Sequence, residues 1–365
     1  MIIGCVKEIK PNEFRVGLTP YAVKSYVSNG HIVYMEKDAG VGAGFTNEAY
    51  IEAGARILNR SEDIWKGSQM IVKVKEPLVS EYQYFRKGLI IYTYLHLAAD
   101  EALTKALIEK EVNAIAYETI KDDSGLPCLR PMSEVAGKLS VLEGARVLFK
   151  HNGGEGLLVT GVTGVPPANV VIIGAGVVGR NALSVAYGLN ANVTMIDINL
   201  NTLISLTYDY PKIKTLVSTE ENIKTALKDA DIVVSGVLLP GAKAPKLIKR
   251  SYYPLMKKGA VIVDVAIDQG GSTEVSKPTT HTNPTFEVDG IIHYCVANMP
   301  GAVPKTSTIA LNHATLKYGL LIANLGLEKS LREHDDLKQG LNTYLGHCTY
   351  KGVADAFNLT CSEFE

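Results

Sequence analysis

The stretch "NVVIIGAGVVGRNALSVAYGLNANVTMID", residues 169–197, decides the fold. An apolar run leads into Gly174-x-Gly176-x-x-Gly179, a helical segment follows, and a second apolar run ends in Asp197. In such a unit the first glycine permits a tight turn, the second lets the backbone approach a pyrophosphate, and the third allows close helix–strand packing. The N–H groups at the start of the helix favour phosphates. The stretch therefore predicts a dinucleotide site on a parallel α/β sheet.

Asp197 also predicts which dinucleotide is bound. A carboxylate at this position accepts hydrogen bonds from ribose hydroxyls and repels a 2′-phosphate. No Arg or Lys occurs from 198 to 211, and Lys212 is the first cation after them. We therefore predict NAD rather than NADP. A second glycine-rich stretch, "DAGVGAGF" at 38–45, has GxGxG spacing and lacks the acid-terminated strand, so we predict a loop there.

Strand-like and helix-like segments alternate along the chain, which is typical of α/β proteins with parallel sheets. The expected strands form two sets, at 2–6, 31–37, 55–58, 69–75, 89–96 and 112–118, then at 169–173, 192–197, 213–217, 231–236, 260–267 and 291–296. Helical segments are expected at 20–29, 132–150 and about 307–325, and the last two are expected to bridge the domains. We predict two Rossmann-like parallel-sheet domains separated by a cleft and joined by long helices. Residues 1–128 with 307–365 would form the substrate domain, and 129–306 the NAD-binding domain.

Composition excludes several classes of protein. The 37 Lys and Arg balance 38 Asp and Glu without a basic stripe, which argues against nucleic acid as a partner. No apolar run approaches the roughly 18 residues of a membrane span. The five cysteines are an odd number without CxxC spacing, which argues against disulfides and a zinc site and for a reducing cytoplasm. We expect all five to be buried, and no metal to be bound.

Four ionisable residues stand at the ends of expected elements: Arg15, Lys75, His96 and Asp268. In open parallel sheets ligands bind outside the carboxyl ends of the strands, so Lys75, His96 and Asp268 are candidates for one cleft. Structural explanations remain open for each of them. Lys75, expected to share a strand face with Lys73, suits a solvated strand end, and Asp268 suits a turn-capping acid. Arg15 suits a surface charge, and His96 a core residue at a strand end.

Three further polar residues have equally ordinary explanations. Ser133 is expected at the start of a helix. Ser218 with Glu221 fits an S-x-x-E capping box. Glu118 ends an expected strand, where a carboxylate can serve as a structural hydrogen-bond acceptor.

Eight sequence blocks in order, from residue 7 to about 308, resemble the alanine dehydrogenase family. They read "KEIKPNEFRVGLTP", "VKVKEP", "YLHLAAD", "PMSEVAGKLS", "GGEGLLVTGVTGVPPANVVIIGAGVVG", "VLLPGAKAPKL", "VDVAIDQGG" and "VANMPGAVPKTST". The resemblance implies a reversible, NAD-dependent oxidative deamination of L-alanine to pyruvate and ammonia. It also implies a homohexamer.

The resemblance further implies roles for individual residues. Arg15 and Lys75 would hold the substrate carboxylate, and His96 and Asp268 would be the catalytic acid/base pair. Residues implied to line the substrate site are Tyr94, Glu118, Asn298 and Met299. Besides the glycines, residues implied at the cofactor are Ser133, Val177, Val178, Asp197, Ser218, Val237, Leu238, Val265, Ala266, Ile267, Asp268, Lys277, Val296, Ala297, Asn298 and Met299.

Two positions depart from the family pattern, and other functions stay open. Family members often carry a basic residue where this chain has Thr202 and an arginine where it has Lys277, both near the adenosine end of NAD. One alternative is an NAD(H)-binding component of a transhydrogenase, although the corresponding cofactor loop reads "RPMSEVAG" instead of Arg-x-Gln-x-Met-Asp. A second alternative is a non-catalytic NAD-binding regulator, which is disfavoured because the four ionisable residues are retained. A third is an amino-acid dehydrogenase with another preferred substrate.

Overall fold

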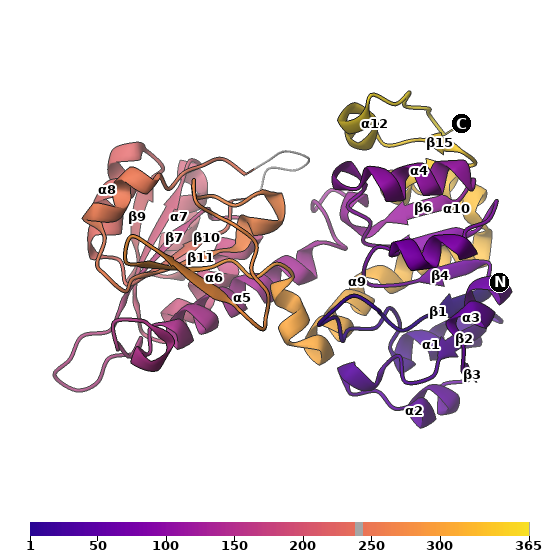
Figure 1. Cartoon of the computed structure of the whole chain (residues 1–365), viewed down its shortest axis with the longest axis horizontal. Coiled ribbons are helices and arrows are strands. Elements are labelled where there is room, and N and C mark those ends of the chain that lie inside the picture. Colours follow the sequence, from indigo (N-terminus) through magenta and orange to yellow (C-terminus); the bar gives the residue numbers. More distant parts are fainter. Residues whose placement is uncertain (238–243, 365) are drawn as a thin grey trace. The chain divides into compact units, whose positions relative to one another are not determined.

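The computed structural model describes residues 1–237 and 244–364, which fall into two compact units (Figure 1). Unit 1 comprises Met1–Met132 with Val303–Glu365, and unit 2 comprises Ser133–Ala302. The expected boundaries, after residues 128 and 306, each lie four residues from those observed. The chain passes from unit 1 into unit 2 within helix α5 (Arg130–Val147).

Unit 1 contains an eight-stranded sheet with the strand order β15-β14-β6-β5-β4-β1-β2-β3. Its strands are β1 (Ile2–Cys5), β2 (Ile32–Glu36), β3 (Arg56–Leu58), β4 (Met70–Val72), β5 (Ile90–Thr93), β6 (Asn113–Ala116), β14 (Leu341–Tyr344) and β15 (His347–Cys348). Its helices are α1 (Pro20–Ser28), α2 (Asn47–Glu52), α3 (Ser61–Gly67), α4 (Glu101–Glu109), α9 (Pro304–Leu325), α10 (Leu327–Glu333), α11 (Asp335–Lys338) and α12 (Lys351–Phe357). All neighbours from β6 to β3 pair in parallel, whereas β14 and β15 pair antiparallel.

Unit 2 contains a seven-stranded sheet with the strand order β12-β13-β11-β10-β7-β8-β9. Its strands are β7 (Asn169–Ile173), β8 (Asn192–Asp197), β9 (Lys214–Val217), β10 (Ile232–Ser235), β11 (Val261–Asp264), β12 (Thr285–Val288) and β13 (Ile291–Tyr294). Its helices, besides most of α5, are α6 (Val177–Gly188), α7 (Leu200–Asp209) and α8 (Glu220–Asp229). Among the described strands of this sheet, only β12 pairs antiparallel, with β13.

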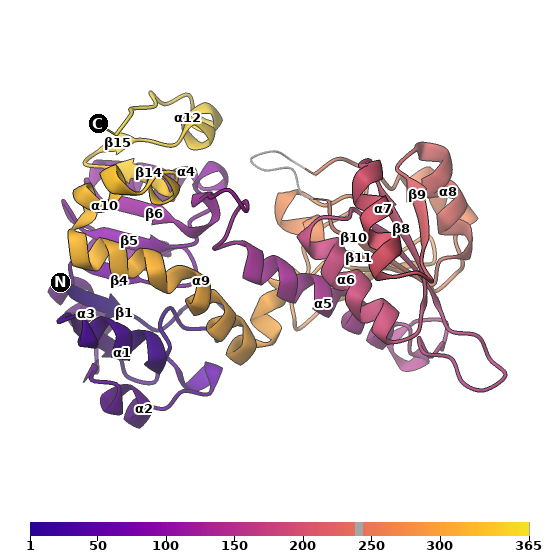
Figure 2. The ribbon, with the colours of Figure 1, turned by 180° about the vertical axis from the view of Figure 1, so that it is seen from behind.

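The prediction of an α/β protein with two mostly parallel sheets is confirmed. Helices cover both faces of each sheet, so successive residues of a strand pack into two different hydrophobic cores. In unit 1, Ile71 and Ile91 pack with α3 and α4, whereas Met70, Val72 and Tyr92 pack with α1 and α9. Figure 1 shows α4 on one face of this sheet, and Figure 2 shows α9 and α10 on the other.

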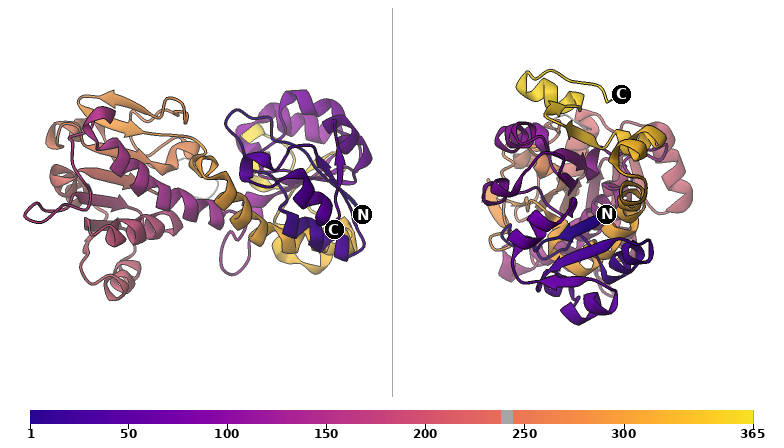
Figure 3. Two further views of the ribbon diagram at one scale, coloured as in Figure 1. Left: turned by 90° about the horizontal axis from the view of Figure 1, so that it is seen from below. Right: turned by 90° about the vertical axis from the view of Figure 1, so that its right-hand side faces the viewer.

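The sequence pattern missed β12, β14 and β15, which lack an unbroken apolar run. All three lie at or next to a sheet edge and pair antiparallel. The C-terminal helix α12 lies near β15, at that edge of unit 1 (Figure 3). Edge strands need burial on fewer sides, so polar residues are tolerated there.

Helix starts follow side-chain capping, with one correction. Thr19 caps α1 by accepting the Ala22 N–H, and Pro20 follows it as the first helical residue. The expected cap of α8 by Ser218 is wrong, because Thr219 caps the helix and accepts the Asn222 N–H at 3.2 Å. The Ser218 N–H instead donates to the Asp197 carbonyl at 2.9 Å and prolongs the pairing of β9 with β8.

All five cysteines were expected to be buried, and this is confirmed for four of them and wrong for one. Cys5, Cys128, Cys295 and Cys348 are buried free thiols, whereas Cys361 is exposed. Cys361 lies after α12, where little chain remains to cover it. Separately, none of the helices within the described ranges is long and apolar enough to cross a membrane.

A buried histidine in β13 makes the stability of unit 2 depend on pH. His293 is 0 % exposed, and its ring centroid lies 4.9 Å from that of the stacked Phe286 and 5.5 Å from that of Tyr253. Neither ring nitrogen has a hydrogen-bond partner among the described residues, and burial lowers the pKa of His293 from 6.5 to about 4. The neutral ring therefore favours the folded state fully above the unfolded pKa, and this advantage is lost as pH falls from about 6.5 to about 4.

We expect the free energy of unfolding to fall by about 3 kcal/mol over this range on account of His293, since each pKa unit corresponds to about 1.4 kcal/mol. Urea unfolding followed by circular dichroism at several pH values measures it. His293→Phe should remove this component, and His151→Gln, which changes an exposed histidine, should not. The explanation fails if His293→Phe and the unmodified chain lose stability in parallel.

Candidate active site and cofactor site

The glycine turn of unit 2 has the geometry that phosphate binding needs. Gly174 has φ +96°, and its N–H donates to the Ile196 carbonyl at 2.8 Å. A Cβ on Gly179 would lie 1.7 Å from the Gly174 oxygen, so only glycine lets α6 start this close to the turn. A Cβ on Gly176 would meet no atom of the described residues within 4 Å. The space beside Gly176 is therefore open to a ligand at the N-terminus of α6.

Asp197 ends β8 and holds the same turn. Its Oδ2 accepts the Ala175 N–H at 2.6 Å, and its Oδ1 accepts the Asn199 N–H at 2.7 Å. Both bonds orient the carboxylate and leave its remaining lone pairs available as acceptors. Thr202 lies in the first turn of α7, where its N–H donates to the Asn199 side chain.

The other expected cofactor residues gather at one edge of the unit 2 sheet. Strands β7 to β11 and β13 run parallel, so their carboxyl ends lie along the same edge. Residues that follow these ends are Gly174, Gly176, Val177, Val178, Gly179, Asp197, Ser218, Val237, Val265, Ala266, Ile267, Asp268, Val296, Ala297, Asn298 and Met299. Leu238 lies outside the described residues, and Ser133 lies in the first turns of α5, which begins earlier than expected.

Asp268 does not end a strand as expected. Strand β11 stops at Asp264, and Asp268 lies in the following 3₁₀ helix (Val265–Gln269), where its side chain is exposed. The Asp264 carboxylate interrupts the strand, because it accepts the N–H groups of Ala266 at 3.2 Å and Ser272 at 2.8 Å. A buried carboxylate thus fixes the helix that carries Asp268.

Lys277 and Asn298 occupy distinct places in unit 2. The Lys277 ammonium lies 4.5 Å from the centre of the Phe286 ring, a cation–π geometry. Asn298 adopts φ +64°, and its carbonyl accepts hydrogen bonds from His281 Nε2 at 3.1 Å and the Gly301 N–H at 2.9 Å. The residues around Asn298 therefore form a backbone-fixed turn after β13.

In unit 1, the expected substrate residues also follow the carboxyl ends of parallel strands. Arg15 lies in the segment after β1, Lys75 follows β4, Tyr94 and His96 follow β5, and Glu118 follows β6. The four strands are adjacent and parallel, so these side chains belong to one edge of the sheet. At this edge Tyr94 and Glu118 both contact His96, Tyr94 by ring stacking and Glu118 by accepting its backbone N–H.

Arg15 is not the surface charge that its sequence position also allowed. Its side chain is 2 % exposed, and its Nε and Nη2 bond Glu13 at 2.7 and 2.6 Å. Nη1 lies 3.1 Å from the Met132 sulfur. Burial alone would lower the pKa of Arg15, but Glu13 raises it above its ordinary value. The guanidinium is therefore permanently charged and held in a fixed orientation.

Lys73 and Lys75 differ in environment, contrary to the shared strand face expected for them. Strand β4 ends at Val72, and Lys73 is 0 % exposed between Glu8 and Glu81, whereas Lys75 is partly exposed. The Lys73 N–H still donates to the Tyr92 carbonyl of β5 at 3.2 Å, whereas the N–H groups of Val74 and Lys75 donate to the Glu8 carboxylate. Lys73 is thus structural, and Lys75 remains accessible to a ligand.

His96 lies beyond its strand in a left-handed turn. Strand β5 ends at Thr93, and His96 has φ +51° with an exposed side chain that stacks on Tyr94 at 6.0 Å. Glu118 Oε1 accepts the His96 N–H at 2.6 Å and the Leu95 N–H at 3.1 Å. Glu118 therefore has the structural acceptor role that its position allowed. His96 is an exposed residue rather than a core one.

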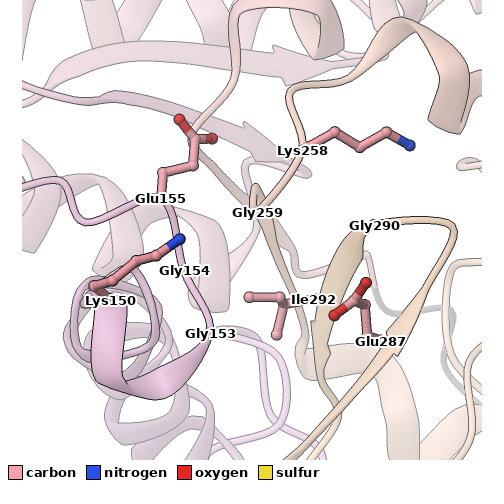
Figure 4. Close-up of a pocket in the computed structure, with 9 residues that line it drawn as sticks. All are labelled: Lys150, Gly153, Gly154, Glu155, Lys258, Gly259, Glu287, Gly290 and Ile292. Carbon is pink, nitrogen blue, oxygen red and sulfur yellow. The ribbon is translucent and has the colours of Figure 1, made fainter.

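A cavity of about 340 Å³ in unit 2 is lined by none of the expected cofactor residues (Figure 4). Gly259 and Gly290 on its lining precede β11 and β13, so it lies at the amino ends of the strands, opposite the glycine turn. Ligands of such sheets bind at the carboxyl ends. The cavity is therefore not the expected cofactor site.

Two family models cover almost the whole chain. The N-terminal domain model of alanine dehydrogenase/PNT matches residues 4–136, and the corresponding C-terminal domain model matches residues 140–351. The chain belongs to the alanine dehydrogenase/PNT family. The family predicted from the eight sequence blocks is confirmed.

Relatives within the alanine dehydrogenase/PNT family are similar along their full length. An alanine dehydrogenase of Bacillus subtilis is 54 % identical over 97 % of this chain and 94 % of its own. That of Staphylococcus haemolyticus is 51 % identical over 100 % and 98 %. A solved L-alanine dehydrogenase has 47 % identity and a TM-score of 0.95, covering 98 % and 99 %. A transhydrogenase structure from Sinorhizobium meliloti, at 23 % identity and TM-score 0.82 over 96 % and 99 %, shares the fold.

Sequence reasoning missed the acidic residues that hold the expected site residues in place. Glu8, Glu13, Glu81 and Asp264 are each at most 8 % exposed. The signal available in the sequence was the pair of acids in "KEIKPNEFR", which precede a buried arginine. Glu8 accepts the N–H groups of Val74 and Lys75, which are 66 and 67 positions away, so no local spacing identifies that contact.

Proposed function

We propose that this chain catalyses the NAD-dependent, reversible oxidative deamination of L-alanine to pyruvate and ammonia. The observation that carries the proposal is the set Arg15, Lys75 and His96 at the carboxyl edge of unit 1, in a chain about half identical to alanine dehydrogenases. A regulator that had lost turnover would not need these groups. The level of identity also favours a dehydrogenase over a transhydrogenase component.

The residues of unit 2 fit a bound NAD. The open space at Gly176 suits the pyrophosphate, and Asp197 suits the adenosine ribose hydroxyls. Residues 265–268 and 296–299 would hold the nicotinamide half, Lys277 would lie near the adenosine end, and Ser133 would belong to the same cofactor site. When bound, NAD supplies the hydride acceptor.

Arg15 and Lys75 would orient the substrate through its carboxylate. A buried arginine and a partly exposed lysine would each give the carboxylate a charge-assisted hydrogen bond. They fix the substrate Cα so that the Cα–H bond can break with its electron pair. Tyr94, Glu118, Asn298 and Met299 would form the surroundings of the site, Glu118 by holding the backbone of His96.

His96 would carry protons in the steps after oxidation. Loss of hydride from the neutral amine of alanine leaves an iminium, to which water adds while its proton passes to His96, giving a carbinolamine. His96 then returns that proton to the nitrogen, and as the C–N bond breaks it takes the hydroxyl proton, so that the pyruvate carbonyl forms and ammonia leaves. An imidazole can both accept and donate a proton, so it serves in both directions. Asp268 would orient the water or stabilise the positive nitrogen.

An absorbance assay for NADH tests the activity. The purified chain with NAD is offered L-alanine, glycine, L-serine and L-valine, and in reverse NADH with pyruvate and ammonium. We expect the highest kcat/KM with L-alanine. NADH binding without turnover of any of these amino acids would indicate a regulator, and hydride exchange between NADH and NADP would indicate a transhydrogenase component.

Asp197 is expected to set the preference for NAD over NADP. In Asp197→Asn the repulsion of a 2′-phosphate is lost, so the ratio of kcat/KM for NAD to that for NADP should fall about tenfold or more, which is about 1.4 kcal/mol of discrimination. Asp209→Asn, at the other end of α7, should leave the ratio unchanged. Equal use of both cofactors by the unmodified chain would contradict this assignment.

The assembly and location of the protein are part of the same proposal. By family resemblance we propose a homohexamer, and the buried free thiols suit a reducing cytoplasm. Light scattering coupled to size-exclusion chromatography measures the assembly. A monomer at micromolar concentration would contradict the proposed hexamer.

A further inference from the structure

A buried ion triad lies directly beside the lysine proposed to bind substrate. Lys73 is 0 % exposed, and its ammonium lies 3.2 Å from Glu8 Oε2 and 3.1 Å from Glu81 Oε1. Glu8 and Glu81 are 8 % and 5 % exposed. The three residues come from the ends of β1 and β4 and from the 3₁₀ helix that follows (Val79–Tyr84). We call them the Lys73 triad.

The second oxygens of both carboxylates bind one short stretch of backbone. Glu8 Oε1 accepts the N–H groups of Val74 at 2.6 Å and Lys75 at 3.2 Å. Glu81 Oε2 accepts the Leu78 N–H at 2.8 Å. Proline at position 77 has no N–H. The triad therefore fixes the segment 74–78 at both ends, with Lys75 inside it.

The triad also connects this segment to the one that carries Arg15. Glu8 belongs to the stretch between β1 and α1, and in the same stretch Lys10 pairs with Glu76. Glu13, which orients Arg15, lies five positions after Glu8. The two cations proposed to hold the substrate carboxylate are thus on segments joined by charged contacts.

Stability alone does not account for the triad. Burial raises the pKa of Glu8 although Lys73 opposes it, which shows that the carboxylate is poorly solvated. Replacing a buried ion pair by apolar residues of similar volume is often neutral or stabilising. Apolar residues, however, have no acceptors for the N–H groups of Val74, Lys75 and Leu78. The carboxylates of the triad are therefore needed to hold the backbone of segment 74–78 in place.

We propose that the Lys73 triad positions Lys75 for the substrate carboxylate, with Glu8, Lys73 and Glu81 as positioning residues. The inference rests on the proposed function of Lys75. It assigns a role in substrate affinity to three side chains that do not themselves touch the substrate.

A double-mutant cycle between Glu8 and Lys75 tests the proposal, with pyruvate, ammonium and NADH as substrates. Lys75→Met should raise KM for pyruvate strongly. Glu8→Gln keeps an acceptor for the backbone but loses the charge that faces Lys73. We expect about a tenfold higher KM for pyruvate. The kcat should change less than about twofold, and the Kd of NADH should be unchanged. In the Lys75→Met background Glu8→Gln should add little, because coupled residues are not additive.

Three outcomes distinguish the claims. If Lys75→Met leaves KM unchanged, the proposed function of Lys75 fails. If Lys75→Met raises KM but Glu8→Gln does not, the positioning role of the triad is wrong. The positioning role is also wrong if Glu8→Gln raises KM by the same factor in the unmodified chain and in the Lys75→Met variant. Should Glu8→Gln fail to fold, Glu81→Gln is tested by the same cycle. Thr46→Ala, which removes the cap of α2, controls for lost stability and should leave KM unchanged.

Discussion

His96→Gly is expected to lower kcat by about 10²–10⁴-fold while unit 1 remains folded. The loss is the contribution of a positioned general acid and base. His96 has φ +51°, a left-handed conformation that disfavours side chains by roughly 1–2 kcal/mol and that glycine adopts readily. The variant should therefore be at least as stable as the parent. Steady-state kinetics and thermal unfolding measure the two effects.

His96→Asn serves as the matched control for this substitution. Asparagine also tolerates positive φ but does not titrate, so it should be as inactive as the glycine variant. Both should bind NADH with unchanged Kd, since His96 belongs to unit 1. Near-normal turnover by either variant would remove His96 from the proposed mechanism.

Lys73→Met is expected to destabilise unit 1 by about 3–5 kcal/mol, the usual consequence of removing one partner from a buried ion pair. Glu8 and Glu81 would then face each other without a cation. Burial already raises the pKa of Glu8, and loss of the Lys73 charge would raise it further, so stability would fall further as pH increases. The loss should therefore be smaller at about pH 5 than at about pH 8.

Thermal unfolding at these two pH values measures the effect of Lys73→Met. Lys66→Met is the control, because Lys66 is an exposed lysine that pairs with Glu62 at 2.6 Å within α3. Such a pair contributes at most about 1 kcal/mol. If both substitutions cost the same, the Lys73 triad is not a buried electrostatic unit.

Much of the fold was predictable because its signals are local. The strand ending at Ile173, the glycine turn and Asp197 lie within one short stretch, and their spacing reflects contacts between chain neighbours. The edge position of Lys75 and His96 followed from the rule for parallel strands. The residues at which β4 and β5 end could not be predicted by that rule. Just beyond these ends, Glu8 and Glu118 accept backbone N–H groups that would otherwise be available to the sheet.

Long-range polar contacts set the remaining details. Glu8 and Val74 are 66 positions apart, and Glu118 and His96 are 22 apart, so no periodicity reports either contact. The wrong cap of α8 has a different cause. Ser218 and Thr219 are both good capping residues, and the choice between them depends on strand pairing with Asp197.

The interruption of unit 1 by unit 2 affects how the protein is synthesised. Strands β1 to β6 emerge from the ribosome first, whereas α9 and the closing strands β14 and β15 come last. Translation of Ser133–Ala302 takes on the order of 10–30 s. During that interval the nascent chain presents an open apolar sheet face, while the inserted unit is continuous and can fold at once. Chaperone demand should therefore fall on the N-terminal portion.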